Sequence, residues 1–193
     1  MTKGMRWRIV TLQAILVIAL GVTSGIAFWA SGFATTFVHE QLVAQKIYFP
    51  DKDQIKTGGA LDPAVFPAEI RAYAGTQVDS GDKARVYAND FIRIHLSKVA
   101  NGQTYSQVST AAQADPTNAK LAAQKTTLFQ GEMLRTSLLN AWGWSLVGTY
   151  TGYAAWALLA AALAVLAALV FELFIARDTV EAVKPRAINS KAA

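Results

Sequence analysis

Residues 136–171 read "TSLLNAWGWSLVGTYTGYAAWALLAAALAVLAALVF" and contain no Asp, Glu, Lys or Arg. About 20 consecutive apolar residues are enough to cross a bilayer as a helix, so this run is long enough to span a membrane. A second run without charged residues covers residues 9–38. The two runs predict two transmembrane helices, which are separated by a polar segment of roughly a hundred residues.

The composition agrees with a membrane protein. Of the 193 residues, 53% are hydrophobic and only 16% are charged, a balance more apolar than that of ordinary soluble domains. The length leaves room for one modest domain besides the two spans. The chain has no cysteine, which excludes disulfides, thiol chemistry and cysteine-ligated metals.

The net charge of +5 is concentrated beside the two apolar runs. Lys3, Arg6 and Arg8 precede the first run, and the segment after the second run is also net basic. Because basic flanks stay in the cytoplasm, we expect a two-pass plasma membrane protein with both termini cytoplasmic and an extracytoplasmic central domain. The positive charge then reports topology, and no nucleic acid partner is expected.

The N-terminal run also has the basic start of a signal peptide. It is longer than the 7–15 residues of a signal-peptide apolar core, which favours an uncleaved anchor. Cleavage after Ala34 is the alternative, and it would leave one span with the N-terminus outside. The expected organisation is a cytoplasmic N-terminus (1–8), a first transmembrane helix (9–33), an extracytoplasmic helical domain (34–137), a second transmembrane helix (138–176) and a cytoplasmic tail (177–193).

Both membrane helices are predicted to continue outside the bilayer. Helical spacing of apolar residues extends the first helix to about Lys46. The last helix is predicted to begin at Pro116, with Asp115 as its cap, and to run to about Arg177. The fold class expected is therefore an all-α membrane protein, with two transmembrane helices extended as stalks and a small helical extracytoplasmic domain between them.

Shorter helices are predicted between the stalks. Residues 48–80 are rich in proline and glycine and are mostly irregular, apart from a short helix near 63–73 with Asp62 as its cap. A longer helix covers 80–101 and is stopped by Asn101 and Gly102, and another short helix follows Thr104.

The stretch "FQGEMLR" (129–135) joins the outer part of the last helix to its apolar run. Glu132 and Arg135 lie at i, i+3, a spacing that forms an ion pair within a helix. Gly131 exposes the backbone and lets another helix approach closely. The stretch is thus either a solvated helix face or a contact point, with the 80–101 helix or with a partner protein.

Two pairs of glycines predict close helix packing in the membrane. Gly21 and Gly25 lie four apart in "GVTSG", and Gly148 and Gly152 lie four apart in "GTYTG". This GxxxG spacing lets helices approach closely in lipid, although glycine-rich composition can produce it by chance. The two pairs lie at different heights above the basic flanks, so the two helices could pack on different neighbours.

Aromatic residues gather at the start of the second apolar run. They favour an interfacial belt at the outer membrane surface, and a groove for lipid, quinone or a partner helix is the alternative. The residues are Trp142, Trp144, Tyr150, Tyr153 and Trp156.

No catalytic constellation is apparent. One class of non-haem iron oxygenases needs two histidines and a carboxylate, and the chain has only His39 and His95. Neither has a second ligand at helical spacing, so we interpret them as an interfacial and a partly buried core histidine. No GxSxG, SxxK, GxGxxG or Walker motif is present. The sequence predicts no catalytic residues, no metal and no cofactor.

The segments "KIYFP", "YAGTQVDSGD", "NGQTYSQVS" and "FQGEMLR" resemble a family of small actinobacterial integral membrane proteins with two spans. Members of that family carry the automatic label "aromatic ring-opening dioxygenase". The resemblance implies a two-span actinobacterial protein with its domain outside the membrane, and it implies no chemistry.

These observations favour a non-enzymatic accessory or scaffold subunit of a membrane complex. Its partners would be other integral membrane subunits and membrane lipids. In actinobacteria one candidate assembly is the respiratory cytochrome bcc–aa3 supercomplex. The alternatives are a stand-alone envelope protein that binds lipid or a small molecule, and a non-haem iron oxygenase as the family label states.

Overall fold

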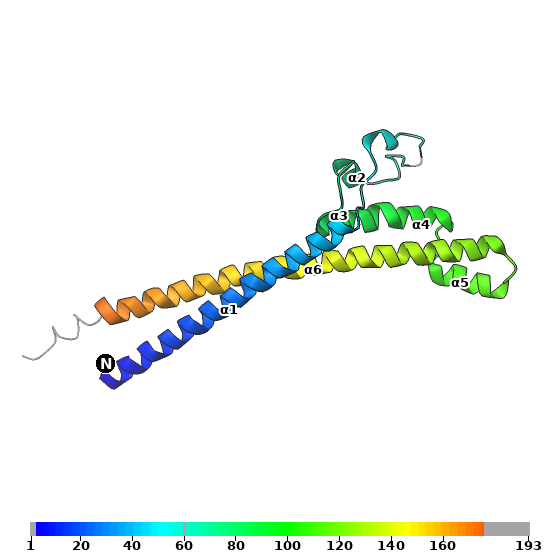
Figure 1. Cartoon of the computed structure of the whole chain (residues 1–193). Helices are drawn as coiled ribbons and strands as arrows, with labels where there is room; N and C mark the ends of the chain where they lie inside the picture. Colours follow the sequence, from blue (N-terminus) through cyan, green and yellow to red (C-terminus); the bar gives the residue numbers. More distant parts are fainter. Residues whose placement is uncertain (1–2, 60, 176–193) are drawn as a thin grey trace, which may run out of the picture. The chain divides into compact units, whose positions relative to one another are not determined.

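The computed structural model describes residues 3–59 and 61–175, and this part of the chain is helical with no strand. The elements are α1 (Lys3–Ala44), the 3-10 helix η1 (Lys52–Gln54), α2 (Ala68–Ala72), α3 (Gly81–Val86), the π-helix η2 (Tyr87–Ile92), α4 (Arg93–Val99), α5 (Tyr105–Ala114), α6 (Ala119–Val170) and the π-helix η3 (Phe171–Ile175) (Figure 1). The predicted cytoplasmic tail, 177–193, lies outside the described residues.

Two of these helices, α1 and α6, are long and apolar enough to cross a membrane, which confirms the prediction of two long apolar helices. The chain forms two compact units. The first comprises residues 1–30 and 151–193, and the second comprises residues 31–150.

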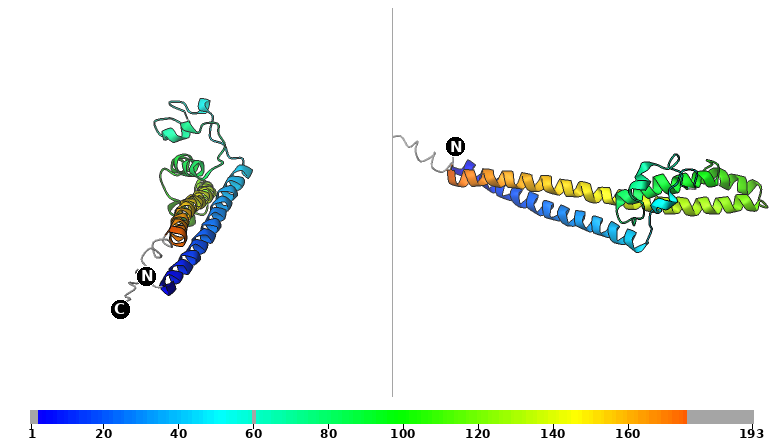
Figure 2. Two further views of the ribbon diagram at one scale, coloured as in Figure 1. Left: turned by 90° about the vertical axis from the view of Figure 1, so that its left-hand side faces the viewer. Right: turned by 90° about the horizontal axis from the view of Figure 1, so that it is seen from above.

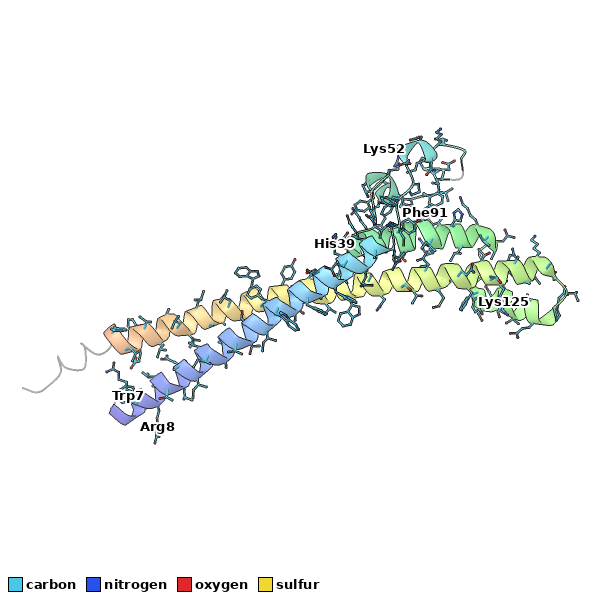
Figure 3. All side chains as sticks on the ribbon, viewed as in Figure 1. Trp7, Arg8, His39, Lys52, Phe91 and Lys125 are labelled. Atoms are coloured by element: carbon cyan, nitrogen blue, oxygen red, sulfur yellow. The ribbon has the colours of Figure 1, made fainter. Side chains whose placement is uncertain are left out.

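In the first unit, the N-terminal part of α1 pairs with the C-terminal part of α6. Ser24 is buried, and its hydroxyl donates to the carbonyl of buried Ala155 at 2.9 Å. Near the start of α1, Arg6 pairs with the Glu172 carboxylate at 3.4 Å and donates to the Glu172 carbonyl in η3. In the most apolar 18-residue stretch of each long helix, only 11% is buried inside the protein. Most side chains here therefore face outward (Figure 3).

In the second unit, the helix formed by α3, η2 and α4 runs beside α6 (Figure 2). Buried residues of these helices form the core together with the end of α1, the segment that follows it and α5. The sequence predicted one helix over 80–101. The structure confirms it, with Ser80 as N-cap and with positive φ at Asn101 (50°) and Gly102 (80°) at its end. The buried residues of this core include Val38, Leu42, Val78, Ala84, Val86, Ala88, Ile92, Leu96, Leu128 and Leu138.

The segment between α1 and α3 is mostly irregular, as predicted. The α1 helix stops at Ala44, and Lys46 has a positive φ of 52°. The expected helix over 63–73 is shorter and starts only at Ala68. Phe66 precedes Pro67, and a residue before proline is kept out of the helical region. Asp62 therefore caps a turn, accepting from the N–H groups of Gly58 and Ala64 at 2.7 and 2.9 Å.

The predicted cap of α5 is present, because the Thr104 hydroxyl accepts from the Gln107 N–H. The start of α6 differs from the prediction. Asp115 binds the side chains of Thr117 and Asn118 instead of capping a helix. The Asn118 side chain then accepts from the Leu121 N–H at 3.2 Å. The helix consequently begins at Ala119, three residues later than Pro116.

Candidate functional site

The "FQGEMLR" stretch lies on α6 where α4 packs against it. A Cβ atom added at Gly131 would lie 2.8 Å from Leu96 Cδ1, closer than real Cβ contacts allow. Leu96 is buried, with 7% of its surface exposed. Gly131 thus permits a close approach of α4 to α6, within the second unit.

The charged pair of this stretch joins α6 to the π-helical segment. Arg135 Nη1 pairs with Glu132 Oε2 at 3.2 Å, as the i, i+3 spacing indicates. Arg135 Nη2 donates to Asn89 Oδ1 at 3.1 Å. Asn89 belongs to the predicted 80–101 helix, so this bond makes the stretch a contact point with that helix. Asn89 lies in the π-helical turn Tyr87–Ile92, and such turns inside α-helices are often found at functional sites.

The other face of the same stretch is apolar and exposed. Phe129 and Met133 expose 51% and 54% of their surface, and Leu134 exposes 37%. Phe129 touches only the edge of the core, through the ring of Tyr105 at a centroid distance of 5.8 Å. The stretch therefore combines an inward polar and glycine face with an outward apolar face.

The two GxxxG pairs differ in their surroundings. In the second unit, the Gly148 carbonyl accepts from the Ser31 hydroxyl at 2.7 Å, and a Cβ at Gly148 would lie 3.3 Å from Ala34 Cβ. In the first unit, a Cβ at Gly21 or Gly25 would meet nothing within 4 Å. Ser24 of the same motif makes the contact with α6 instead. Gly152, the other glycine of the pair on α6, is half-buried.

The aromatic residues at the start of the second apolar run are mostly exposed. Trp142 is half-buried, whereas Trp144, Tyr150, Tyr153 and Trp156 expose 51–66% of their surface. In the first unit, Trp156 packs edge-on against Phe28 at a centroid distance of 5.1 Å. In the second unit, Trp144 and Phe37 line a groove of about 190 Å³ between α6 and α1. An interfacial belt stays a prediction for these residues.

The two histidines lie in different surroundings. His39 Nδ1 is 2.8 Å from the Asp79 carbonyl oxygen. The prediction of a partly buried core histidine was wrong for His95, which is exposed and stacks on the ring of Phe91 at the edge of the core. Across residues 3–59 and 61–175, no group of three or more His, Cys, Asp or Glu side chains is placed to hold a metal ion.

One cavity was not predicted from the sequence. It measures about 330 Å³ and lies between α1, the start of α3 and α6. Three segments that are distant in the sequence build it, so no local motif marks it, although His39 and "DSGD" were both noticed. The lining residues are Thr35, Val38, His39, Asp79, Ser80, Gly81, Asp82, Ser145, Leu146 and Thr149.

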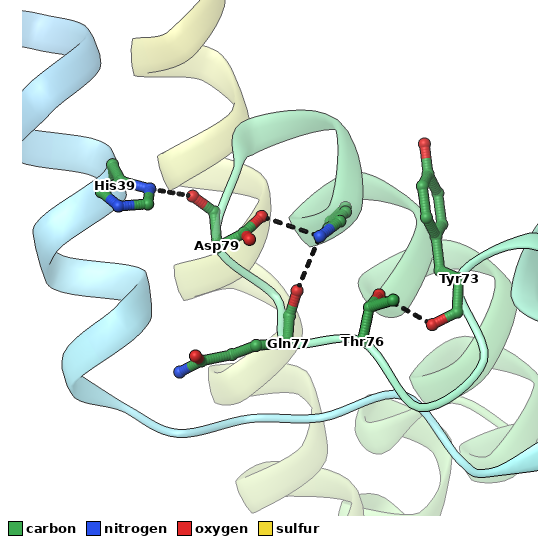
Figure 4. A network of polar contacts seen from close by, with 6 residues as sticks. His39, Tyr73, Thr76, Gln77 and Asp79 are labelled. Atoms are coloured by element: carbon green, nitrogen blue, oxygen red, sulfur yellow. Dashed lines mark hydrogen bonds and ion pairs between the residues drawn. The ribbon is translucent and has the colours of Figure 1, made fainter.

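A network of polar contacts supports one wall of this cavity (Figure 4). The Lys83 ammonium pairs with Asp79 Oδ1 at 3.0 Å and donates to the Gln77 carbonyl at 3.1 Å. The Gln77 side chain donates to the Val43 carbonyl at the end of α1. The 77–83 segment is thereby tied to α1 on one side and to its own helix on the other.

Elsewhere in the second unit, four groups have shifted pKa values. Burial, together with nearby Glu69, raises the pKa of Asp90 above 3.8, against the opposing effect of Arg85 and Arg93. Burial also raises the pKa of Tyr87 above 10.0. Backbone N–H groups hold the pKa of Asp62 below 3.8, and hydrogen bonds from Thr117 and Asn118 do the same for Asp115.

No protein family, curated protein or solved structure matches this chain. Its function is therefore argued from the residues described above.

Proposed function

We propose that the protein is a non-enzymatic accessory subunit that packs its first membrane helix against another integral membrane protein. The observation that carries this proposal is the open glycine pair on α1. Within residues 3–59 and 61–175, a Cβ at Gly21 or Gly25 would meet no atom within 4 Å. A GxxxG face lets a second helix approach to backbone contact in lipid, and no described segment of this chain covers that face.

The apolar face of "FQGEMLR" supports the same proposal. Phe129 and Met133 lie on α6 before its uncharged run begins and are about half exposed. Large apolar side chains grouped on a surface outside the bilayer are typical of protein interfaces. A partner that binds the α1 glycines in the membrane and this face outside it would contact both units.

The proposed setting is the plasma membrane of an actinobacterium. Basic residues beside the apolar runs support a topology with both termini in the cytoplasm, in which α1 and α6 extend as stalks and residues 34–137 form the extracytoplasmic domain. The organism type rests on the resemblance of the quoted segments to two-span actinobacterial proteins. The respiratory cytochrome bcc–aa3 supercomplex is one candidate for the partner complex.

The test is affinity purification of the tagged full chain from native membranes in mild detergent, followed by mass spectrometry. We expect stoichiometric recovery of other integral membrane subunits. Replacing both glycines, Gly21→Ile with Gly25→Ile, should remove those subunits while the chain stays helical, because no internal contact fills the space. Ala19→Ile adds a branched side chain on another exposed face of α1 and should keep the partner.

A clean monomer or homodimer from the wild-type chain would contradict the accessory-subunit proposal. It would favour a stand-alone protein that binds lipid or a small molecule. Co-purifying iron, lost together with activity in a variant lacking both His39 and His95, would favour the oxygenase instead.

A further inference from the structure

The cavity beside His39 has the size of a small-ligand site. Its volume of about 330 Å³ lies at the lower end of the range for ligand pockets, about 300–1,000 Å³. Buried Val38 and Gly81 form part of its lining, and exposed Thr35, Asp82 and Thr149 contribute its outer part. No Lys or Arg is among the residues that line it.

The hydrogen bond of His39 fixes what the ring offers to this cavity. Its Nδ1 lies 2.8 Å from the Asp79 carbonyl oxygen (Figure 4), and a carbonyl oxygen can only accept. Nδ1 therefore carries the proton. In the neutral imidazole the other nitrogen, Nε2, is then an acceptor.

Three hydroxyl groups of the cavity donate their protons to backbone carbonyls. Thr35 donates to the Ser31 carbonyl, Ser145 to the Trp142 carbonyl and Thr149 to the Ser145 carbonyl, at 3.0, 2.7 and 2.9 Å. Each of these hydroxyl oxygens keeps lone pairs. The lining therefore presents further acceptors.

The two carboxylates of the cavity differ in their pairing. Asp79 is neutralised by Lys83 at 3.0 Å. Asp82 forms no ion pair or hydrogen bond with a side chain in the described part of the chain. Asp82 also lies in the first turn of α3, where an acid favours the helix N-terminus. Its negative charge remains accessible at the edge of the cavity.

We propose that this cavity binds the primary ammonium group of a small amine. A carboxylate, an imidazole nitrogen and several hydroxyl oxygens all accept hydrogen bonds, and an ammonium group offers three N–H donors with a positive charge. Lys83, held by Asp79 and the Gln77 carbonyl, shows the same recognition on the other side of Asp79. This site is separate from the proposed partner surface on α1.

The amine can come from a free metabolite or from the ethanolamine headgroup of a phospholipid. Sequence position favours the headgroup, since His39 directly follows the uncharged run 9–38 and Thr149 lies in the uncharged run 136–171. Both sources share the primary ammonium group that the cavity recognises.

The test is a titration of the delipidated full-length protein in detergent with ethanolamine, followed by calorimetry in a buffer without Tris or other amines. Choline is the matched comparison, because its quaternary nitrogen has no N–H donor. We expect ethanolamine to bind at least about tenfold more tightly than choline. Asp82→Asn should weaken ethanolamine binding by about tenfold or more, whereas Asp53→Asn, an exposed acid away from the cavity, should leave it unchanged.

Because Asp82 also stabilises the start of α3, a second variant at another lining residue tests binding without changing α3. Thr149→Val removes an exposed acceptor without touching α3 and should weaken binding several-fold at unchanged helix content. Nanodiscs with phosphatidylethanolamine or phosphatidylcholine then distinguish the two sources. Weaker binding of free ethanolamine in the phosphatidylethanolamine discs indicates that the lipid occupies the site, and equal binding indicates a free amine. Absence of ethanolamine binding, equal binding of choline, or an unaffected Asp82→Asn variant would each overturn the proposal.

Discussion

Gly81 is the residue at which the start of α3 meets α6 most closely. A Cβ atom added there would overlap Ser145 Oγ and Cβ and would lie 3.3 Å from Trp142 Cα. The contact includes backbone and the base of a side chain, so a simple rotation cannot relieve it. The absence of a side chain at this position therefore allows the packing of α3 on α6.

We predict that Gly81→Ala lowers the stability of the second unit by about 1–3 kcal/mol, the usual cost of overpacking. Thermal unfolding in detergent, followed by tryptophan fluorescence, measures the change. Adding Ser145→Gly should recover part of the loss. Gly143→Ala is the control on α6, where no atom lies within 4 Å. It should be neutral or slightly stabilising, and a similar loss there would refute the packing argument.

Asp90 gives the second unit a pH dependence of its own. Burial and Glu69 raise its folded pKa above 3.8, so the folded state binds the proton more tightly than the unfolded state. The contribution of Asp90 is favourable below pH 3.8 and is lost as pH rises through the raised folded value. Asp90→Asn should therefore raise the unfolding midpoint at pH 7 and have little effect at pH 3.5.

Asp62 is the opposite case and serves as the comparison. Its folded pKa lies below 3.8 because its carboxylate accepts from backbone N–H groups. That contribution is present above pH 3.8 and is lost as pH falls through the lowered folded value. Asp62→Asn should lower the midpoint at pH 7. If both variants shifted the midpoint in the same direction, the assigned causes would be wrong.

At the scale of whole elements, periodicity and capping residues predicted most of the helices. The 80–101 helix was predicted because its apolar residues follow helical spacing and an Asn–Gly stop ends the pattern. Its π-helical turn, Tyr87–Ile92, was not predicted. The rings of Tyr87 and Phe91 pack on each other and on Phe49 and Phe66 from the preceding segment, and such tertiary contacts leave no local signal.

The predicted helix boundaries were wrong where polar side chains had alternative hydrogen-bond partners. Asp115 was a reasonable cap for a helix starting at Pro116, but its carboxylate binds Thr117 and Asn118, and Asn118 caps α6 instead. Local sequence contains both possibilities and does not rank them. The competition between side-chain and backbone hydrogen bonds decides such positions.

The candidate surfaces likewise divide into features that local spacing predicts and features that depend on contacts between distant segments. The i, i+3 spacing was sufficient to predict the Glu132–Arg135 pair, because both residues share one helix. The spacing of Gly21 and Gly25 predicted a face for close helix packing but could not say what lies on it. In the structure Ser24 contacts Ala155 and the glycines stay open. The cavity beside His39 escaped prediction because three distant segments build it.

For the molecule as a whole, orientation in the membrane is the property on which the proposed function depends. Two helices are long and apolar enough to span, and Lys3, Arg6 and Arg8 precede the first. The positive-inside rule then predicts a cytoplasmic N-terminus and a central segment outside the membrane. The chain has no cysteine, so a single introduced cysteine reports one position without background labelling.

We predict that Gln113→Cys, an exposed position on α5, reacts with a membrane-impermeant maleimide in intact cells. Ser190→Cys, in the tail, should react only after the membrane is permeabilised, because two spans return the chain to the cytoplasm. The wild-type chain is the unlabelled control. The reverse pattern would show an inverted protein and would move the apolar face at Phe129 and Met133 to the cytoplasmic side.

Labelling alone does not distinguish an anchor from a cleaved signal peptide, since both leave the central segment outside and the tail inside. The intact mass of the purified protein makes that distinction. A mass that retains the N-terminal run is expected, because that run exceeds the length of a signal-peptide apolar core. A mass corresponding to loss of residues 1–34 would remove Gly21 and Gly25 from the mature protein. The partner surface would then have to lie on α6, where the exposed residues Phe129 and Met133 would become the positions to substitute.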